Sequence, residues 1–305
     1  MVQEYVNKLI ENLPDEIKNR KTPLVIDLVL DGGIFNGSYL VGALCFLKEM
    51  EKRNYIKIDR ISGCSIGSII GFLYFIDNLE VMPQLYNLVQ SEFKKCYNLK
   101  VMKTIKNMLK DFVPEDICEK VNKRLFICYN NVIKRKKIVK STYKNVDEIY
   151  NSIIKSCFIP YLIDGNYLYE NKYIDGITPY VFNKVINKKI LYLDLFGYDK
   201  IGNLINIKNE KTNYHRILSG LLDIHSFFIK NSTTQMCSYV NDWNYFNNIC
   251  NYVKLLIEKI CVYVIYIFIL FKNNISKEQK ESLLFKIISK ISQDLIVIIL
   301  ETYCL

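Results

Sequence analysis

The first part of the chain alternates short apolar runs with longer segments of helical spacing. Leu24–Leu30 is mostly apolar, as expected for a strand buried in a parallel sheet. A helix is predicted from about Gly37 to Arg53, then a short strand at Ile58–Ile61 and an apolar segment of helical length at Ser68–Phe75. Strands that alternate with helices predict an α/β fold in which a mainly parallel sheet lies between helices.

The rest of the first 200 residues adds helices, a hairpin and a further strand. Pro14 and Pro160 are expected to mark helix ends, because proline cannot continue a helix. The expected elements, in chain order, are a helix at Val2–Leu13, a helical region from Met82 to about Leu125 broken at Pro114-Glu115-Asp116, a helix at Val146–Cys157, a tight hairpin around Glu170-Asn171 and a strand at Ile190–Leu195.

From Asn213 onward the pattern is mainly helical. Ile260–Phe271 is uncharged and strongly apolar, but a membrane-spanning helix needs about 20 apolar residues, so this segment is too short to span. A second segment begins at Ser276, with Gln279 placed as in a capping box. Its apolar face comprises Leu284, Ile287, Ile288, Ile291, Leu295 and Ile298. We favour packing of both segments on the core, and a lipid-facing surface is the alternative.

Composition agrees with a globular protein. The chain has 305 residues, of which 50% are hydrophobic and 24% charged, and this is enough to bury a full core. The pattern divides the chain into an N-terminal helix (residues 1–21), an α/β domain (residues 22–200) and a mainly helical C-terminal region (residues 201–305).

The formal net charge of +10 is compatible with an anionic partner. Solvated surface lysines are the favoured explanation, and the densest basic run, Lys134–Lys137, is expected at the rim of a hairpin. No recognisable nucleic-acid-binding module accompanies the charge, so no nucleic acid partner is expected. A negatively charged membrane surface remains an open alternative.

Cysteine spacing and the first residues bear on the compartment. The sequence has ten cysteines, but no two lie close enough to form a Cys-x-x-Cys zinc or redox unit. Met1–Tyr5 lacks the basic-then-apolar layout of a secretion signal. We therefore expect a reduced protein with buried thiols, located in the cytoplasm or peripherally on a membrane and not secreted.

The sequence Gly63-Cys64-Ser65-Ile66-Gly67 is the principal candidate for chemistry. It lies between a predicted strand and a predicted helix, the setting in which a sharp turn exposes a nucleophilic serine. Gly63 and Gly67 fit this turn, because larger side chains would keep the strand and the helix apart. The alternative is a purely structural serine. Cys64 is expected to be a packed small residue rather than a nucleophile.

Ester cleavage also requires a base and hydrogen-bond donors for the oxyanion. The turn Asp31-Gly32-Gly33-Ile34-Phe35-Asn36-Gly37 begins a predicted helix, and its glycines let backbone N–H groups approach a substrate closely. Asp31 is expected to order this turn. Asp175, which precedes Gly176 at the end of a short strand, is placed to point a carboxylate into a cleft. Asp164-Gly165 is a competing pair, expected to form a turn ahead of the hairpin.

Taken in this order, the three motifs resemble those of the patatin-like phospholipases, and Ser156–Pro160 resembles the family's approach to its aspartate motif. The likeness covers roughly Leu24–Tyr180. It implies a three-layer α/β/α sandwich and a Ser–Asp dyad without histidine. By this resemblance Ser65 is the nucleophile, Asp175 the base, and Gly32, Gly33 and Ile34 the oxyanion hole, with Asp31, Gly37, Gly63, Gly67 and Gly176 supporting the motifs and residues 22–200 forming the family's domain.

Two positions depart from the family pattern. Ile34 stands where the family loop usually has its third glycine, and the backbone donors are retained there if the φ angle of Ile34 is negative. Asn36 stands at a position that is usually basic, and the missing positive charge is expected to lower the rate.

The leading hypothesis is a lipid acyl hydrolase that cleaves fatty-acyl esters of phospholipids or lysophospholipids through an acyl-enzyme, with no metal or organic cofactor. One alternative is a catalytically weak or inactive lipid-binding protein of the same fold, suggested by Asn36 and the apolar C-terminal segments. Another is a Ser–Asp–His α/β-hydrolase that uses His215 or His225. Against it, the serine turn follows only one strand–helix unit, and His225 lies in an apolar helix, as packed core residues do.

Overall fold

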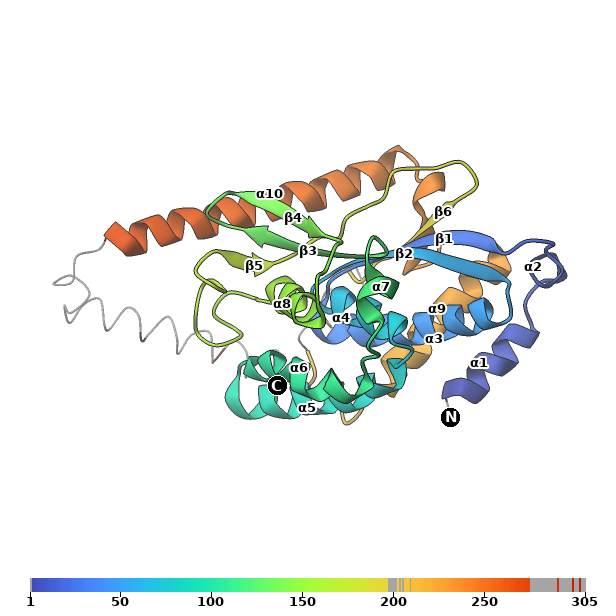
Figure 1. The fold of residues 1–305 in the computed structure, drawn as a ribbon, viewed down its shortest axis with the longest axis horizontal. Coiled ribbons are helices and arrows are strands. Elements are labelled where there is room, and N and C mark those ends of the chain that lie inside the picture. The colour runs from blue at the N-terminus through green and yellow to red at the C-terminus, as the bar shows by residue number, and fades with distance from the viewer. Residues whose placement is uncertain are drawn as a thin grey trace.

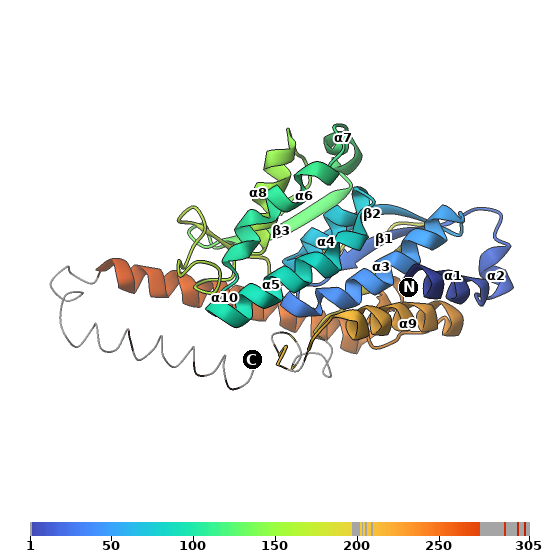
Figure 2. The same ribbon diagram turned by 90° about the horizontal axis from the view of Figure 1, so that it is seen from below.

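The computed structural model describes residues 2–196 and 210–274, together with residues 202, 204, 206–208, 290, 298 and 302. The helix expected from Ser276 lies outside the described residues except for single positions. Within the described part, a twisted sheet forms the centre of the molecule, with a thick layer of helices on one face and one long helix on the other (Figures 1 and 2).

The sheet that the described residues form has seven strands in the order β4-β3-β2-β1-β6-β7, with β5 also paired to β3. The four central strands are parallel, whereas β4, β5 and β7 run antiparallel to their neighbours. The predicted mainly parallel sheet is therefore confirmed. The strands are β1 (Leu24–Leu30), β2 (Ile56–Cys64), β3 (Leu125–Asn131), β4 (Lys136–Lys140), β5 (Tyr173–Asp175), β6 (Lys189–Leu193) and β7 (Cys237–Tyr239).

Helices connect the parallel strands. The α-helices are α1 (Val2–Glu11), α2 (Asp15–Lys18), α3 (Gly37–Lys52), α4 (Ile66–Phe75), α5 (Met82–Cys96), α6 (Ile105–Leu109), α7 (Ile117–Val121), α8 (Val146–Ser156), α9 (Tyr214–Lys230) and α10 (Tyr245–Asn274). Short 3₁₀ turns include η1 (Ile34–Asn36), η2 (Leu79–Val81), η3 (Lys100–Thr104), η4 (Lys110–Phe112) and η6 (Val240–Asp242).

Side chains of the central strands alternate between two faces, as the pleat requires. On β1, Leu28 and Leu30 enter the main core beneath α3, α4 and α9, whereas Val29 packs with Phe182 and Tyr192 on the other face. Helix α10 covers part of that second face, where its Val262 packs on residues at the end of β3 and on β5. This arrangement confirms the predicted α/β/α fold class (Figure 1).

Helices α3 and α9 pack backbone against backbone. A Cβ atom on Gly42 would lie 1.9 Å from the carbonyl oxygen of Ile217, and one on Gly220 would lie 1.9 Å from that of Tyr39. Only glycine fits at both positions, so α9 is held tightly against α3. The domain boundary expected at residue 200 stays a prediction, and α9 and β7, which follow it, contact α3 and β6.

Most sequence-predicted elements are confirmed, and the exceptions have local causes. The helical region after Met82 is interrupted at Tyr97, which adopts a left-handed conformation (φ 52°), and the Leu99 N–H then donates to the carbonyl of Leu162 at 2.8 Å. The expected hairpin turn is confirmed, since Glu170 and Asn171 both have positive φ, but only its second arm joins the sheet, as β5.

The apolar segment at Ile260–Phe271 is part of the 30-residue helix α10. The favoured interpretation, that this segment packs on the core, is wrong for most of it: Ile260, Val264 and Phe271 are 53%, 59% and 69% exposed. Only one stripe of the helix reaches the body of the protein, because a single helix laid on a sheet buries a single face. Among the described residues, no helix combines the length and the hydropathy needed to cross a membrane.

The thiols divide between interior and surface. Cys64, Cys128 and Cys157 are buried, whereas Cys96 and Cys250 are exposed. The expectation of buried thiols therefore holds for only part of the cysteines. The basic run at Lys134–Lys137 does lie at the rim of the β3–β4 hairpin, as predicted.

Candidate active site

Ser65 occupies the sharp turn between β2 and α4. Its φ and ψ angles are 49° and −128°, a conformation that non-glycine residues adopt only when their surroundings impose it. The surroundings here are tight, since a Cβ on Gly63 would lie 2.5 Å from the carbonyl oxygen of Gly67. A Cβ on Gly67 would in turn lie 2.7 Å from the carbonyl oxygen of Asp31. The two glycines thus allow the strand, the turn and the helix to close around the serine, as the sequence predicts.

Strand β3 brings Ser65 and Asp175 together, although 109 residues would otherwise separate them. Cys64, the last residue of β2, pairs with Cys128 of β3, and Asp175 of β5 pairs with Tyr129, the next residue along. A Cβ on Gly176 would lie 2.1 Å from the carbonyl oxygen of Cys128, so glycine is required for this approach. The predicted nucleophile and the predicted base therefore lie side by side along the same edge of β3.

The Ser65 side chain lies near enough to the Asp175 carboxyl to lower its pKa. One carboxyl oxygen, Oδ1, is buried and has no hydrogen-bond partner among the described residues. Burial raises the pKa of Asp175 well above its usual range, the hydrogen bond from Ser65 lowers it, and the negative charge of Glu258 raises it further. A carboxyl group with spare acceptor capacity and a raised pKa is suited to accept a proton from the serine.

Ser156 fixes the backbone of the serine turn from α8. Its hydroxyl accepts a hydrogen bond from the Ser65 N–H at 2.9 Å and donates one to the carbonyl oxygen of Cys128 at 2.6 Å. The amide of Ser65 is therefore committed to a protein partner. Oxyanion donors must come from another part of the site.

The turn after β1 lies directly against Ser65. A Cβ on Gly32 would be only 3.2 Å from the Cβ of Ser65. The Gly32 N–H donates to the Asp31 carboxylate at 3.1 Å, as a residue that orders this turn would require. The amides of Gly33 and Ile34 have no hydrogen-bond acceptor within the part of the chain that the structure describes. Of the three predicted oxyanion donors, these two are available to a ligand.

Ile34 departs from the expectation of a negative φ angle. Its φ is 42°, in the left-handed region, which is strongly disfavoured for a β-branched residue. The isoleucine therefore occupies a glycine-like conformation, so the condition of a negative φ at this position is not met. The surrounding contacts must compensate this strain.

Asn36 stands at the position where the family usually has a basic residue. Its side chain is completely buried beside a buried arginine. Arg216 of α9 donates from Nη1 to Asn36 Oδ1 at 2.7 Å, and the Asn36 side-chain amide donates to the carbonyl of Leu195 at 3.3 Å. Glu210 pairs with the same guanidinium, at 2.5 Å from Nη2 and 2.9 Å from Nε. The positive charge missing from the turn is thus present next to it, supplied by a residue of α9.

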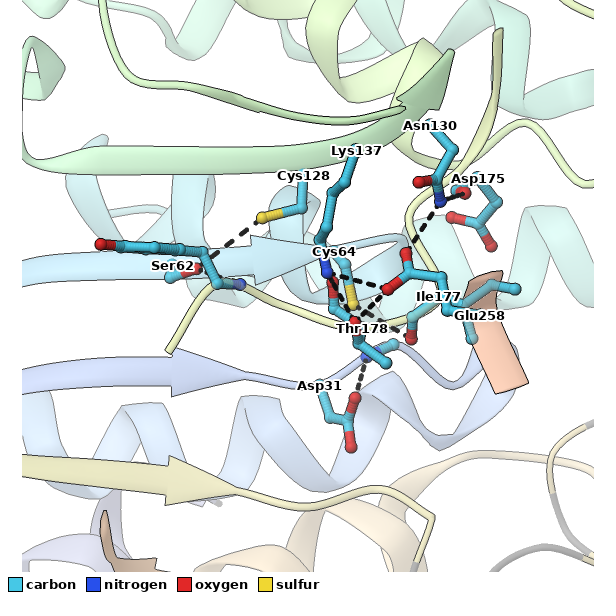
Figure 3. A network of polar contacts seen from close by, with 12 residues as sticks. Asp31, Ser62, Cys64, Cys128, Asn130, Lys137, Asp175, Ile177, Thr178 and Glu258 are labelled. Carbon is cyan, nitrogen blue, oxygen red and sulfur yellow. Dashed lines mark hydrogen bonds and ion pairs between the residues drawn. The ribbon is translucent and has the colours of Figure 1, made fainter. Parts of the chain in front are cut away.

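Helix α10 contributes two charged groups, the partly buried Lys254 and the buried Glu258, to the surroundings of the site. Lys254 pairs with Asp31 at 3.2 Å and with Asp194 at 3.0 Å. One helical turn later, Glu258 accepts a hydrogen bond from Asn130 at 2.8 Å, and the same Asn130 amide donates to the Asp175 carbonyl at 2.9 Å. Figure 3 shows Asn130 between Glu258 and Asp175, so α10 supports both the turn after β1 and the aspartate.

Glu258 is stabilised by a compact set of partners. Lys137 of β4 lies 3.0 Å from its carboxylate, and the Thr178 hydroxyl hydrogen-bonds to the same oxygen. Lys137 also contacts the Thr178 hydroxyl and carbonyl oxygens, each at 2.5 Å (Figure 3). These partners supply the hydrogen bonds and the ion pair that a buried carboxyl group requires.

Asp31 should make folding stability pH-dependent. Burial raises its pKa to about 7, with Lys254 opposing and Asp194 adding to the shift. A carboxyl with a raised pKa in the folded state contributes stability below the ordinary pKa of about 3.9, and loses it as pH rises through about 7. Thermal melts between pH 5 and pH 8 should therefore show a smaller decline in Tm for Asp31→Asn than for the wild type.

The matched control for this measurement is Asp242→Asn, at an aspartate whose side chain is 61% exposed. It should retain the wild-type dependence of Tm on pH. A decline of equal slope in Asp31→Asn and the wild type would mean that Asp31 does not carry this pH dependence.

An apolar pocket of about 740 Å³, mouth included, opens on Ser65. Ile34 lies at the same pocket, so the serine and the turn after β1 share it. Most of its wall comes from the region between β2 and β3, including Ile66, Leu85, Met102, Ile105 and Met108. Such a lining suits a flexible hydrocarbon chain rather than a polar ligand.

The competing candidates lie elsewhere. Asp164 forms an ion pair with Lys103 and accepts a hydrogen bond from the Asn166 N–H, as expected for a turn residue. His215 is 58% exposed and contacts Glu210, whereas His225 packs its ring against Phe46. Cys64 is buried, and burial raises the pKa of its thiol well above the usual range, which fits a packed residue.

Three charged residues around this site were not predicted from the sequence. Arg216, Lys254 and Glu258 belong to no local motif and lie after the motif-bearing region. A usable signal existed for two of them: Lys254 and Glu258 are four residues apart in a largely apolar helix, so they share one face. Arg216 carries no comparable signal.

Comparison with known proteins agrees with the fold and with the motif region. Residues 28–178 match the family model of the patatin-like phospholipases. A probable lipid hydrolase 463L of Invertebrate iridescent virus 6 is 33% identical over 178 residues, covering 49% of this chain and 58% of that protein.

Two mouse proteins show similar matches. An omega-hydroxyceramide transacylase is 26% identical over 155 residues, covering 48% of this chain and 26% of that protein. The 1-acylglycerol-3-phosphate O-acyltransferase Pnpla3 is 24% identical over 152 residues, covering 47% of this chain and 37% of that protein. The chain thus matches only part of the length of each relative. Residues 28–178 of this chain therefore belong to the patatin-like phospholipase family.

Proposed function

We propose that the protein is a serine-dependent lipid acyl hydrolase that acts on phospholipids or lysophospholipids. The observation that carries this proposal is the convergence of three features: the strained Ser65, the Asp175 carboxyl beside it, and the apolar pocket that opens on the serine. The apolar lining of this pocket, with Ser65 on its wall, supports binding of a fatty-acyl chain whose ester carbonyl would lie at the serine. Family membership supports lipid acyl chemistry in general, and the substrate class is inferred from the apolar lining.

The reaction proceeds in two steps. Asp175 accepts the proton of the Ser65 hydroxyl as its oxygen attacks the ester carbonyl, and the amides of Gly33 and Ile34 stabilise the oxyanion. The protonated Asp175 then donates its proton to the departing alcohol, which leaves the acyl group on Ser65. In the second step Asp175 takes a proton from water, the resulting nucleophile attacks the acyl-serine, and the fatty acid is released while Ser65 regains its proton. All the groups in these steps belong to the protein, water or substrate, and no metal or organic cofactor enters them.

The positively charged environment favours the reaction in a specific way. Arg216 holds the turn that carries the oxyanion donors through Asn36, and Lys254 holds Asp31 at the other end of the same turn. Fixing both ends keeps the amides of Gly33 and Ile34 in place before the oxyanion forms. The substrate resides in membranes, so the proposal includes peripheral contact with a lipid surface and requires no nucleic acid.

A fluorophosphonate probe tests the proposal directly. The probe reacts only with an activated serine, so it should label the wild type at Ser65 and leave Ser65→Ala unlabelled. The measurement is intact mass, followed by peptide mapping of the modified residue. Ser68→Ala is the matched control: its hydroxyl already donates to the Ser65 carbonyl oxygen at 2.7 Å and has no part in the proposed reaction, so labelling should persist.

Absence of labelling in the folded wild type would favour the second candidate, a lipid-binding protein of the same fold without turnover. The left-handed Ile34 and the buried Asn36 are the departures that motivate this candidate. Two of the relatives are named for acyl transfer, so the products of labelled phospholipid should also be separated. Free fatty acid as the main product agrees with hydrolysis, whereas acylated alcohol would indicate transfer to an acceptor.

A further inference from the structure

Helix α10 is apolar on nearly all sides, although only one side is covered. The covered stripe contains Glu258 and Val262, both buried, and the partly buried Lys254, Ile265 and Ile269. A helix that is apolar all round normally lies within a core or in contact with lipid. The outward side of α10 therefore lacks the polar surface that a water-exposed helix should have.

The outward side is extensive and aromatic. Its residues are 41% to 82% exposed: Tyr245, Phe246, Ile249, Tyr252, Val253, Leu256, Ile257, Ile260, Tyr263, Val264, Ile267, Phe268, Leu270 and Phe271. We call this set the α10 outer face. A continuous exposed apolar surface of this kind marks an interaction site.

Several positive charges border the α10 outer face. Glu258 is the only acidic residue of α10, and it is buried on the opposite side. Lys259 and Lys272 are exposed on α10 itself. On the adjoining β3–β4 hairpin, Arg135 lies 5.8 Å and 5.2 Å from the ring centres of Tyr263 and Tyr266. An apolar and aromatic face bordered by cations matches an interfacial helix that binds anionic lipid headgroups.

We infer that the α10 outer face is the surface by which this protein sits on an anionic lipid bilayer. This inference rests on the proposed function for its significance, because a lipid hydrolase must reach a lipid surface. A second copy of the chain fits less well, since it would bring a second set of the same cations, Lys259 and Lys272, to this face. The catalytic region lies close by: the inner side of the same helix contacts Asp31 through Lys254 and Asn130 through Glu258.

In this placement, helix α10 contacts lipid with its outer side and the surroundings of the active site with its inner side. A helix is about 10 Å across, so a bilayer in contact with the outer face lies within roughly that distance of Lys254 and Glu258. Lipid contact would immobilise α10, and with it the two side chains that hold the turn after β1 and the β3–β5 edge. The same helix, α10, therefore binds the lipid surface and positions residues of the active site.

Vesicle co-sedimentation of the full chain tests the inference. We use Ser65→Ala as the parent, so that lipid breakdown does not affect binding, with vesicles of phosphatidylcholine alone or mixed with phosphatidylglycerol. The parent should sediment preferentially with the anionic vesicles. Ile260→Glu combined with Val264→Glu should reduce the partition coefficient at least about tenfold, because each change places a negative charge in the contact. Lys259→Gln and Lys272→Gln should each reduce it about fivefold.

The matched control is Leu222→Glu, at a residue of α9 that is 55% exposed and lies away from α10. It should bind the vesicles as the parent does. Equal binding of the parent and the Ile260→Glu/Val264→Glu variant would overturn the inference. So would a halved mass of that variant in sedimentation equilibrium, which would indicate a dimer contact. A lowered unfolding midpoint with unchanged vesicle binding would also contradict it, because the face would then be covered by the chain itself.

The outcome for lipid seating is separable from that for catalysis. With an intact Ser65, the charged variants should hydrolyse a soluble short-chain ester at the wild-type rate and hydrolyse vesicle phospholipid at least tenfold more slowly. If the wild type sediments with anionic vesicles but is not labelled by the fluorophosphonate, the seating surface stands and the proposed hydrolysis fails. If the wild type is labelled but does not sediment with anionic vesicles, the proposed hydrolysis stands and the inferred lipid-binding surface fails.

Discussion

Asp175→Asn is expected to reduce kcat for ester hydrolysis by about 10²–10⁴-fold, the usual contribution of a positioned general base. The amide that replaces the carboxylate cannot accept the Ser65 proton, whereas its size and shape are retained. Steady-state hydrolysis of a soluble ester is the measurement. Folding should not suffer, because burial raises the pKa of Asp175 and its ionised form therefore costs stability as pH rises through that raised value. Above neutral pH, Asp175→Asn should be at least as stable as the wild type.

The chain provides a matched control in Asp164→Asn, the other Asp–Gly pair. Asp164 pairs with Lys103 rather than facing the serine, so this variant should keep its activity. In the wild type, the acidic limb of the kcat/KM profile should lie well above the ordinary aspartate pKa, because the base must lose its proton to act. Full activity in Asp175→Asn, together with loss in His215→Ala or His225→Ala, would contradict the dyad and favour a histidine base.

Arg216→Met should produce the largest loss of stability among the site variants, about 3–5 kcal/mol in the free energy of unfolding. The guanidinium is completely buried, and its removal leaves Glu210 without its main partner and Asn36 without the donor at 2.7 Å. The turn that carries the Gly33 and Ile34 amides loses its anchor, so kcat should fall more than KM rises. Denaturant titration and steady-state kinetics measure the two effects.

Two further variants distinguish the effect of breaking the buried Arg216–Glu210 pair from the effect of removing any arginine. Arg53→Met removes a partly exposed pair with Glu49 on α3, and it should change the free energy of unfolding by no more than about 1 kcal/mol. Arg216→Met combined with Glu210→Gln should recover part of the stability, because no uncompensated charge remains, while kcat stays low. A loss below about 1 kcal/mol with normal kcat in Arg216→Met would show that the turn does not depend on this residue.

Short sequence patterns predicted those elements whose structure depends on neighbouring residues in the chain. The apolar run Leu24–Leu30 coincides with β1, because a strand buried on both faces tolerates few polar side chains. The glycines around Ser65 predicted the strained turn, since only glycine permits the backbone approaches found there. The pairing of Asp175 with Ser65 came from resemblance to a family, because nothing in the residues between them specifies the register of β5 on β3.

Other features depend on contacts between distant parts of the chain. Strand β7 has three residues and exists because it pairs with β6, so its sequence carries no strong strand pattern. The end of α5 at Cys96 is marked by no proline or glycine and follows from the docking of Leu99 on Leu162. The positive φ of Ile34 could not be expected from a β-branched residue, whose intrinsic preference is the opposite. Arg216 is buried only because α9 packs against α3.

The way β3 organises the site has an evolutionary consequence. The catalytic pair is spaced by the register of β2 and β5 on one strand, whereas α5 and α6, which form much of the pocket wall, belong to the connection between β2 and β3. That connection can lengthen, shorten or change its side chains while the strand pairings stay the same. Descendants of such a scaffold can acquire preferences for acyl chains of different length or shape without rebuilding the reaction centre.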